Sequence, residues 1–117
     1  MGRRILIIDD NPSLCVALKD RLQAMGYSVI VAHDGRTGLA LMTLEAKQAP
    51  IGGVLLDMHM PIMDGIQVLR ELQIQHKHVP VVMMTADPDH RVQRVHGRLR
   101  NHRDRGPADV LPELLFR

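Results

Sequence analysis

The chain has 117 residues, of which 45% are hydrophobic and 24% are charged. This length suits one domain, and the apolar share is too high for a chain that is disordered throughout. A single cysteine excludes an intramolecular disulfide, and the apolar runs are too short to cross a membrane. We therefore expect one globular domain over residues 1–117, in the reducing cytoplasm, with no secretory signal peptide at its start.

Charge and aromatic residues are unevenly distributed along the sequence. Residues 1–89 hold 8 Lys and Arg against 10 Asp and Glu, a net charge of −2. Residues 90–117 hold 7 Arg against 3 acidic residues, a net charge of +4. The formal charge of +2 for the whole chain conceals this division. Because Tyr27 and Phe116 are the two aromatic residues, the core must be built from Leu, Ile, Val and Met.

The first three-quarters of the sequence alternates between strand and helix patterns. The expected strands are apolar, β-favouring runs of the kind found in sheets covered on both faces, and they span residues 4–10, 27–32, 54–57 and 79–84. The first helix begins at Asn11-Pro12, and Asp34 caps the second. The apolar positions of the three helices are Leu14, Leu18, Leu22 and Met25, then Leu39 and Met42, then Ile66, Leu69 and Leu72.

This alternation predicts a doubly wound α/β fold, in which a parallel sheet has helices on both faces. After residue 88 the pattern weakens. A fourth helix is expected from Pro88-Asp89, and its apolar face would hold Val92, Val95 and Leu99. The fifth strand has two candidates, residues 108–111 and residues 99–104, and with the second a short final helix would begin at Pro107. The fifth βα unit is therefore degenerate or incomplete.

Polar residues whose side chains could bind a ligand or react lie where three of the expected strands end. Asp9 and Asp10 end the first strand, Asp57 ends the third, and Thr85 follows the fourth. Because functional groups gather at the carboxyl ends of parallel strands, neighbouring first and third strands would bring three carboxylates together. Such a cluster needs a cation, and an all-oxygen site suits Mg²⁺. A metal-held Asp in this pocket can attack phosphorus and form an aspartyl-phosphate.

Other polar residues have simpler interpretations. Asp34 and Asp64 are typical turn residues or helix caps. Cys15 lies beside core positions of the first helix, which indicates a small buried side chain. His76 and His78 share a polar stretch, so a surface loop is favoured there over a metal site.

Three segments together resemble the receiver domain of two-component response regulators, and these are ILIIDDNP, LLDMHMPIMDG and VVMMTA. They stand in the order and spacing of that family. The resemblance covers residues 3–89 well, whereas residues 90–117 form an atypical basic end. It implies a flavodoxin-like (βα)5 fold and a phosphoacceptor domain rather than an enzyme, with at most slow Mg²⁺-dependent self-phosphorylation and autodephosphorylation.

The resemblance also implies roles for individual residues. Asp57 would be the phosphoacceptor and Thr85 the switch hydroxyl that moves to the phosphate. Mg²⁺ would be bound by Asp10, Asp57 and the backbone carbonyl of His59, and through water by Asp9. The remaining matched positions are Met58 and Ala86 in the phosphate pocket, His59 and Asp87 where side chains tune the lifetime of the phosphoryl group, and Pro61 and Gly65 in the loop that shapes the pocket.

The C-terminal end departs from the family pattern. The family has a Lys followed by Pro at the end of strand five, but this sequence has Lys only at positions 19, 47 and 77. If Pro107 matches that Pro, Gly106 stands where the Lys would be. The switch aromatic of strand five is also missing. Divergence, exchange between subunits, truncation and a frameshift all remain open as explanations.

Three functions follow for testing. The first is a receiver that takes a phosphoryl group from a sensor histidine kinase or phosphotransfer protein and signals to a downstream protein effector, with a homodimer left open. The second is a pseudo-receiver, impaired in phosphorylation, that acts as a protein-interaction module. The third is nucleic-acid binding, which would use Arg91, Arg94, Arg98, Arg100, Arg103 and Arg105. A basic surface that is simply exposed to solvent is the favoured interpretation of these arginines.

Overall fold

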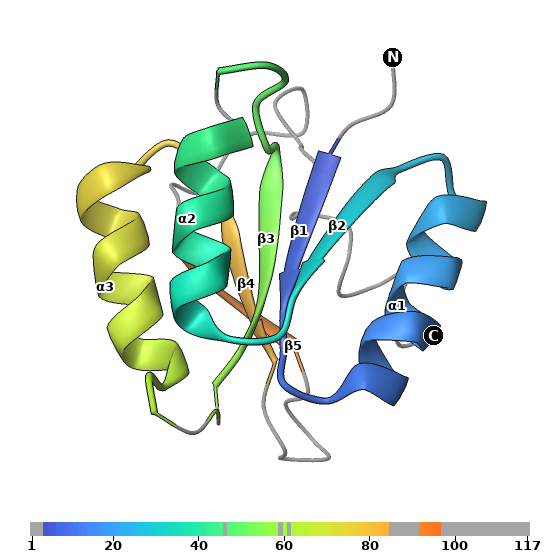
Figure 1. Ribbon diagram of the computed structural model, residues 1–117, viewed down its shortest axis with the longest axis horizontal. Coiled ribbons are helices and arrows are strands. Elements are labelled where there is room, and N and C mark those ends of the chain that lie inside the picture. Colours follow the sequence, from blue (N-terminus) through green and yellow to red (C-terminus); the bar gives the residue numbers. More distant parts are fainter. Residues whose placement is uncertain (1–3, 46, 59, 61, 85–91, 97–117) are drawn as a thin grey trace.

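The computed structural model describes residues 4–45, 47–58, 60, 62–84 and 92–96. Its strands and helices alternate as the sequence predicts as far as the fourth strand (Figure 1). In chain order the elements are β1 (Arg4–Ile8), α1 (Pro12–Ala24), β2 (Ser28–Ala32), α2 (Gly35–Glu45), β3 (Gly53–Asp57), α3 (Gly65–Gln75), β4 (Val81–Met84) and β5 (Val92–His96). Within the described part of the chain, no helix combines the length and the apolar character needed to cross a membrane.

The strands form a single sheet in the order β2-β1-β3-β4-β5. The first four are parallel, and their order is that of flavodoxin-like doubly wound sheets. Figure 1 shows α2 and α3 side by side on one face and α1 on the other. The predicted fold class is therefore confirmed for this four-stranded parallel part.

The fifth strand differs from the expectation. Residues 92–96 form β5, which runs antiparallel to β4 with Met84 paired to Val92 and Val81 to His96. The predicted helix from Pro88-Asp89 is therefore wrong over these residues. β-branched valines favour strands, and an unpaired edge of β4 offers backbone hydrogen bonds that a helix would leave unused. The alternatives at residues 99–104, 108–111 and from Pro107 lie outside the described residues.

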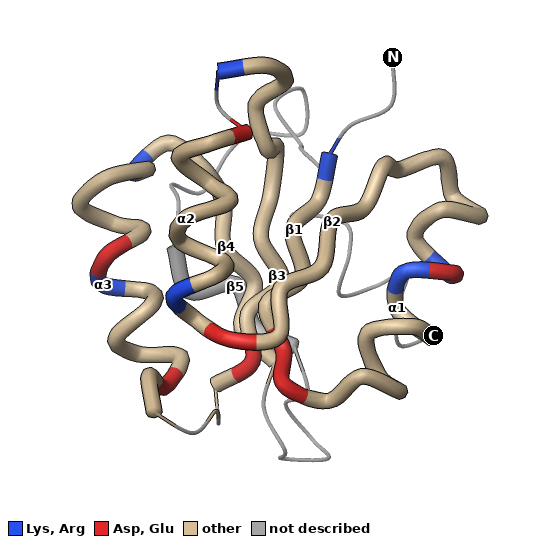
Figure 2. Tube along the Cα trace, in the orientation of Figure 1, with Lys and Arg blue, Asp and Glu red and all other residues tan. Residues whose placement is uncertain are grey.

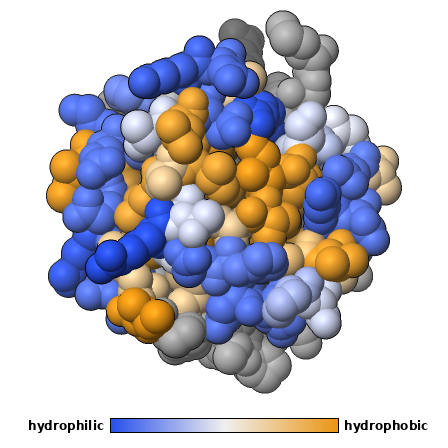
Figure 3. Space-filling model, in the orientation of Figure 1, coloured by the Kyte–Doolittle hydropathy of each residue, from blue (hydrophilic) through white to orange (hydrophobic). Residues whose placement is uncertain are grey.

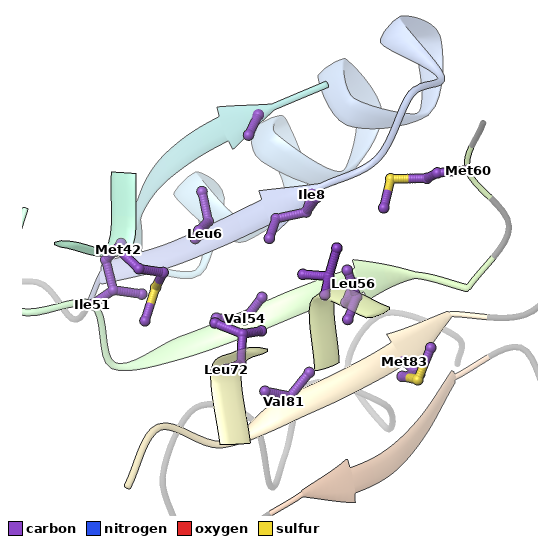
Figure 4. Packing of buried hydrophobic residues seen from close by; sticks show 12 residues of the cluster. Leu6, Ile8, Met42, Ile51, Val54, Leu56, Met60, Leu72, Val81 and Met83 are labelled. Atoms are coloured by element: carbon purple, nitrogen blue, oxygen red, sulfur yellow. The ribbon is translucent and has the colours of Figure 1, made fainter. Parts of the chain in front are cut away.

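Two hydrophobic clusters cover the two faces of the sheet. Because side chains alternate along a strand, even-numbered and odd-numbered residues of β1 enter different clusters. The cluster beneath α2 and α3 contains Leu6, Ile8, Met42, Val54, Leu56, Leu72, Val81 and Met83 (Figure 4). The cluster beneath α1 contains Ile5, Ile7, Cys15, Leu18, Leu22, Leu55, Val82 and Met84. All of these side chains are buried.

Helix α1 buries Leu18 and Leu22 as predicted, but its first predicted core position, Leu14, is not buried. Leu14, predicted in the core, is 39% exposed, whereas Cys15 is 2% exposed and packs with Leu18 and Leu22. The reason lies in the helix start, where Asn11 accepts a hydrogen bond from the Leu14 amide and holds Leu14 in the first turn at the rim of the sheet. Burial of Cys15 agrees with its interpretation as a small core side chain.

The outer edge of the sheet is less completely covered. Figure 3 shows hydrophobic side chains at the surface over β1 and β2, beside α2. Ile30 of β2 is half-buried against the cluster beneath α2 and α3. The carboxyl ends of the strands, in contrast, are the edge at which acidic residues gather (Figure 2).

Candidate functional site

The three carboxylates that follow β1 and end β3 meet at one edge of the sheet. Ile8 pairs with Leu56, so Asp9 and Asp57 follow at the same level on adjacent strands. One carboxylate oxygen from each of Asp9, Asp10 and Asp57 lies within 4.8 Å of the others. Asp9 is 2% exposed, Asp57 is half-buried and Asp10 faces solvent. We call these three residues the acidic cluster.

The backbone around Asp9 is fixed by several hydrogen bonds. Its amide donates to the Ala32 carbonyl at 3.0 Å, which extends the pairing of β1 with β2. Its Oδ1 accepts the Asn11 amide at 2.9 Å. Helix α1 begins immediately after this turn, with Asn11 as N-cap and Pro12 in the first turn. Asp9 and Asp10 therefore lie between the carboxyl end of β1 and the start of α1, and not within the sheet.

The electrostatics of the acidic cluster favour a cation. Burial raises the pKa of Asp9 above its usual value, and the charge of Asp10 raises it further, while the hydrogen bond from Asn11 opposes the shift. Burial and the same three carboxylates raise the pKa of the Cys15 thiol to about 11. Carboxylate oxygens are the donors that Mg²⁺ prefers. The donor set at this edge therefore fits a hard divalent ion.

The loop from β3 to α3 packs closely against the end of β3. The Gly65 amide donates to the Met58 carbonyl at 3.1 Å, and Met60 is buried. Asp64 caps α3 in a reciprocal pair with Gln67, so its interpretation as a helix cap is confirmed. Between them, Ile62 is 96% exposed and has a φ of 69°, a conformation that a β-branched residue rarely adopts.

The structure places some of the predicted site residues and not others. Asp57 pairs with Met84, and the Met58 amide donates to the Met84 carbonyl at 3.0 Å, so Met58 lies against the end of β4. Thr85 follows Met84 in the sequence. The other predicted residues lie outside the described residues, and these are Thr85, Ala86, Asp87, His59 and Pro61. The second helix cap, Asp34, is confirmed by its two hydrogen bonds from Thr37 at 2.7 and 2.8 Å.

Sequence reasoning missed one group beside the acidic cluster. The His33 ring, just after β2, and the Cys15 thiol, on α1, both contact the carbonyl oxygen of Asp9, at 3.2 and 3.4 Å. A signal was available, because a residue that follows β2 lies next to a residue that follows β1 when the two strands are neighbours. His76 is half-buried and His78 exposed at the end of α3, away from the acidic cluster.

Comparison with known proteins supports the same family. A family model for the response regulator receiver domain matches residues 5–97. Response regulator MprA of Mycolicibacterium vanbaalenii is 36% identical over 113 residues, which cover 97% of this chain and 45% of that protein. Transcriptional regulatory protein CpxR of Klebsiella pneumoniae is 41% identical over 83 residues, which cover 71% of this chain and 33% of that protein. The chain thus spans less than half the length of these relatives.

Solved structures agree with the sequence comparisons. Response regulator protein TrrA of Thermotoga maritima, in complex with Mg²⁺ and BeF, superposes with a TM-score of 0.65 at 30% identity. The match covers 76% of this chain and 74% of that one.

Proposed function

This chain belongs to the response regulator receiver domain family, and we propose that it accepts a phosphoryl group on Asp57 with the help of Mg²⁺. Members of the family are phosphoacceptor signalling modules rather than conventional enzymes. The acidic cluster is the observation that carries the proposal, because three carboxylates within 4.8 Å of one another combine a nucleophile with the ligands of a hard cation.

The residues that would hold Mg²⁺ are Asp10 and Asp57 directly, with the backbone carbonyl of His59, and Asp9 through water. The oxygen donors, the mutual repulsion of the carboxylates and the raised pKa of Asp9 support this assignment. Bound there, Mg²⁺ would offset the charge of the incoming phosphoryl oxygens and orient them toward Asp57. The complex of the similar TrrA with Mg²⁺ and BeF adds support.

Asp57 would be the nucleophile in the phosphoryl transfer. An oxygen of its carboxylate forms a bond to phosphorus while the bond from phosphorus to the donor's imidazole nitrogen breaks. The imidazole leaves with the bonding electron pair and takes up a proton from water. Half-burial of Asp57 at the sheet edge supports this role, since the donor can reach it while the surrounding backbone excludes part of the water.

The residues after β4 would convert this chemistry into a signal. We assign Thr85 as the switch hydroxyl, Ala86 and Met58 to the phosphate pocket, and His59 and Asp87 to tuning of the phosphoryl lifetime. The donor would be a sensor histidine kinase or phosphotransfer protein and the output a downstream protein effector, in the cytoplasm. The closeness of Met58 to the end of β4 supports communication between Asp57 and this segment.

A pseudo-receiver is the second candidate, favoured by one observation. All three lysines of the sequence lie before residue 78, so none of residues 85–117 is a lysine that could pair with the phosphate. Under this alternative the acidic cluster binds Mg²⁺ and the domain recognises a partner without accepting a phosphoryl group. Arg replaces a lysine poorly at such a position because its charge is spread over a planar group.

Phosphotransfer from acetyl phosphate separates the two candidates. Intact-mass spectrometry of the full chain is the readout, since the chain has no Trp to report binding by fluorescence. We expect Mg²⁺-dependent addition of one phosphoryl group that hydroxylamine removes, and loss of the addition in Asp57→Asn. Asp20→Asn, an exposed acid on α1, is the matched control and should label as the wild type does. Mg²⁺ binding without any labelling of the wild type would establish the pseudo-receiver instead.

A further inference from the structure

We propose that His33 is a positioning residue for the acidic cluster, and that together with Cys15 it fixes the peptide group joining Asp9 to Asp10. This inference rests on the proposed function in one respect, namely that the acidic cluster holds a cation. It concerns two side chains, one from α1 and one from the connection between β2 and α2, that converge on a single backbone oxygen.

The contacts on that oxygen define the arrangement. The His33 Nδ1 lies 3.2 Å and the Cys15 Sγ 3.4 Å from the carbonyl oxygen of Asp9, and the two side-chain atoms are 3.8 Å apart. A carbonyl oxygen can only accept, so Nδ1 carries the hydrogen of the His33 ring and the Cys15 thiol donates its own. We call this pair of contacts the Asp9 carbonyl clamp.

The position of the Asp9 carbonyl oxygen explains how the clamp would act on the acidic cluster. The Asp9 carbonyl belongs to the peptide plane between the two acidic residues, so rotation of that plane would swing Asp10 away from Asp9. On the other side of the residue, the Asp9 amide is bound to Ala32 and the Asp9 Oδ1 to Asn11. The clamp adds a restraint on the peptide plane between Asp9 and Asp10.

Repulsion within the acidic cluster explains why a restraint is needed. Three carboxylates lie within 4.8 Å of one another, and one of them, Asp9, is 2% exposed. Like charges at this separation push Asp9 and Asp10 away from Asp57. A cluster that is held in place before the cation arrives loses less free energy to reorganisation on binding. Residues that hold metal ligands in position raise metal affinity in the same way.

The position of His33 separates this role from general packing. His33 is exposed, so its replacement removes a donor to Asp9 without opening a cavity. Cys15, in contrast, is a core residue, and its replacement would alter packing and geometry together. His33 is therefore the residue to test.

The test uses the full chain with His33→Ala, His33→Asn and His78→Ala. The Nδ2 of asparagine can take the place of the imidazole Nδ1 and restore the donor, and His78 is an exposed histidine away from the acidic cluster. Calorimetric titration with Mg²⁺ gives the affinity, and the amide signal of Asp10 in the metal-free protein reports the peptide plane by nuclear magnetic resonance. We expect His33→Ala to weaken Mg²⁺ binding about tenfold and to broaden the Asp10 signal, with the thermal midpoint unchanged. His33→Asn should recover most of the affinity.

Several results would overturn the inference. These are wild-type Mg²⁺ affinity in His33→Ala, equal losses in His33→Ala and His33→Asn, a loss matched by His78→Ala, and a loss accompanied by a lowered thermal midpoint, which would mark a general structural role. Absence of Mg²⁺ binding by the wild type would also overturn it. Failure of the proposed function is distinct, because it shows as missing phosphoryl labelling of a wild type that still binds Mg²⁺.

Discussion

Gly65 lies so close to Asp57 that a β-carbon at position 65 would overlap the Asp57 carbonyl oxygen. The same β-carbon would be 2.6 Å from the Cα of Met58, and both neighbours are backbone atoms that cannot rotate away. The first turn of α3 is therefore packed directly against the residue that we propose as phosphoacceptor. Absence of a side chain at Gly65 is what allows this approach.

Replacement of Gly65 by alanine should therefore destabilise the protein and disturb Asp57. We expect Gly65→Ala to lower the free energy of unfolding by about 2 kcal/mol, as overpacking does in cores, and to slow phosphoryl labelling. Urea denaturation followed by circular dichroism measures the first effect. Gly52→Ala is the control, because its β-carbon would lie 3.5 Å from the Arg4 carbonyl oxygen, an ordinary contact. Equal stability of the two variants would contradict the packing described here.

Ile62 offers a change in the opposite direction. Its φ of 69° strains a β-branched residue, and at 96% exposure its side chain gains no burial in return. We expect Ile62→Asn to raise the free energy of unfolding by about 1 kcal/mol, because asparagine tolerates the left-handed region. Ile74→Asn, at an exposed position of α3, should instead lose a few tenths of a kcal/mol. Destabilisation by Ile62→Asn would mean that the strain is not present.

Asp9 should make the metal-free protein less stable at neutral pH. Since its pKa is raised on folding, the folded state binds the proton more tightly than the unfolded state does. Stability contributed through Asp9 is therefore fully present below 3.8, its ordinary pKa, and is lost as the pH rises through the raised value. Asp9→Asn, in a chelator, should unfold at a higher urea concentration than the wild type at pH 7, with a smaller difference at low pH.

Comparison of Asp9→Asn with the wild type separates the effect of Asp9 on stability from the effects of the other acidic residues. Asp34 acts in the opposite sense, because hydrogen bonds from Thr37 lower its pKa and its contribution is lost as the pH falls. Asp20→Asn serves as the control for removal of one surface charge. A lower urea midpoint for Asp9→Asn at pH 7 would show that the Asp9 charge does not destabilise the metal-free fold.

The Cys15 thiol should react slowly in the folded protein. It is 2% exposed and its pKa is raised to about 11, so at pH 8 on the order of one thiol in a thousand is ionised. Reaction with a disulfide reagent should be far slower in the native state than in urea, and should speed up as the pH approaches 11. Similar native and unfolded rates at pH 8 would contradict the burial and the raised pKa together.

The sequence predicted most of the parallel part of this fold because local and global signals agree there. The apolar runs of β1, β3 and β4 are buried on both faces, and capping residues mark where helices begin. Convergence of Asp9, Asp10 and Asp57 was predicted on the condition that the first and third strands are neighbours, and the strand order of the structure meets that condition.

What the sequence did not predict depends on contacts between distant segments. Leu14 and Cys15 are both apolar, and the choice between them is made by the exact start of α1. The antiparallel β5 depends on the free edge of β4, and the clamp on Asp9 depends on the pairing of β1 with β2. The left-handed Ile62 carries no local signal, because glycine or asparagine would be the usual residue there.

The central claim is that Asp57 accepts a phosphoryl group. Site-resolved mass spectrometry of the wild-type chain after exposure to acetyl phosphate and Mg²⁺ tests it most directly, with reduction of the acyl phosphate by borohydride to mark the modified residue. The account predicts a single modified residue, Asp57, and none when Mg²⁺ is chelated. Modification at another acidic residue, or none at all with Mg²⁺ bound, would contradict it.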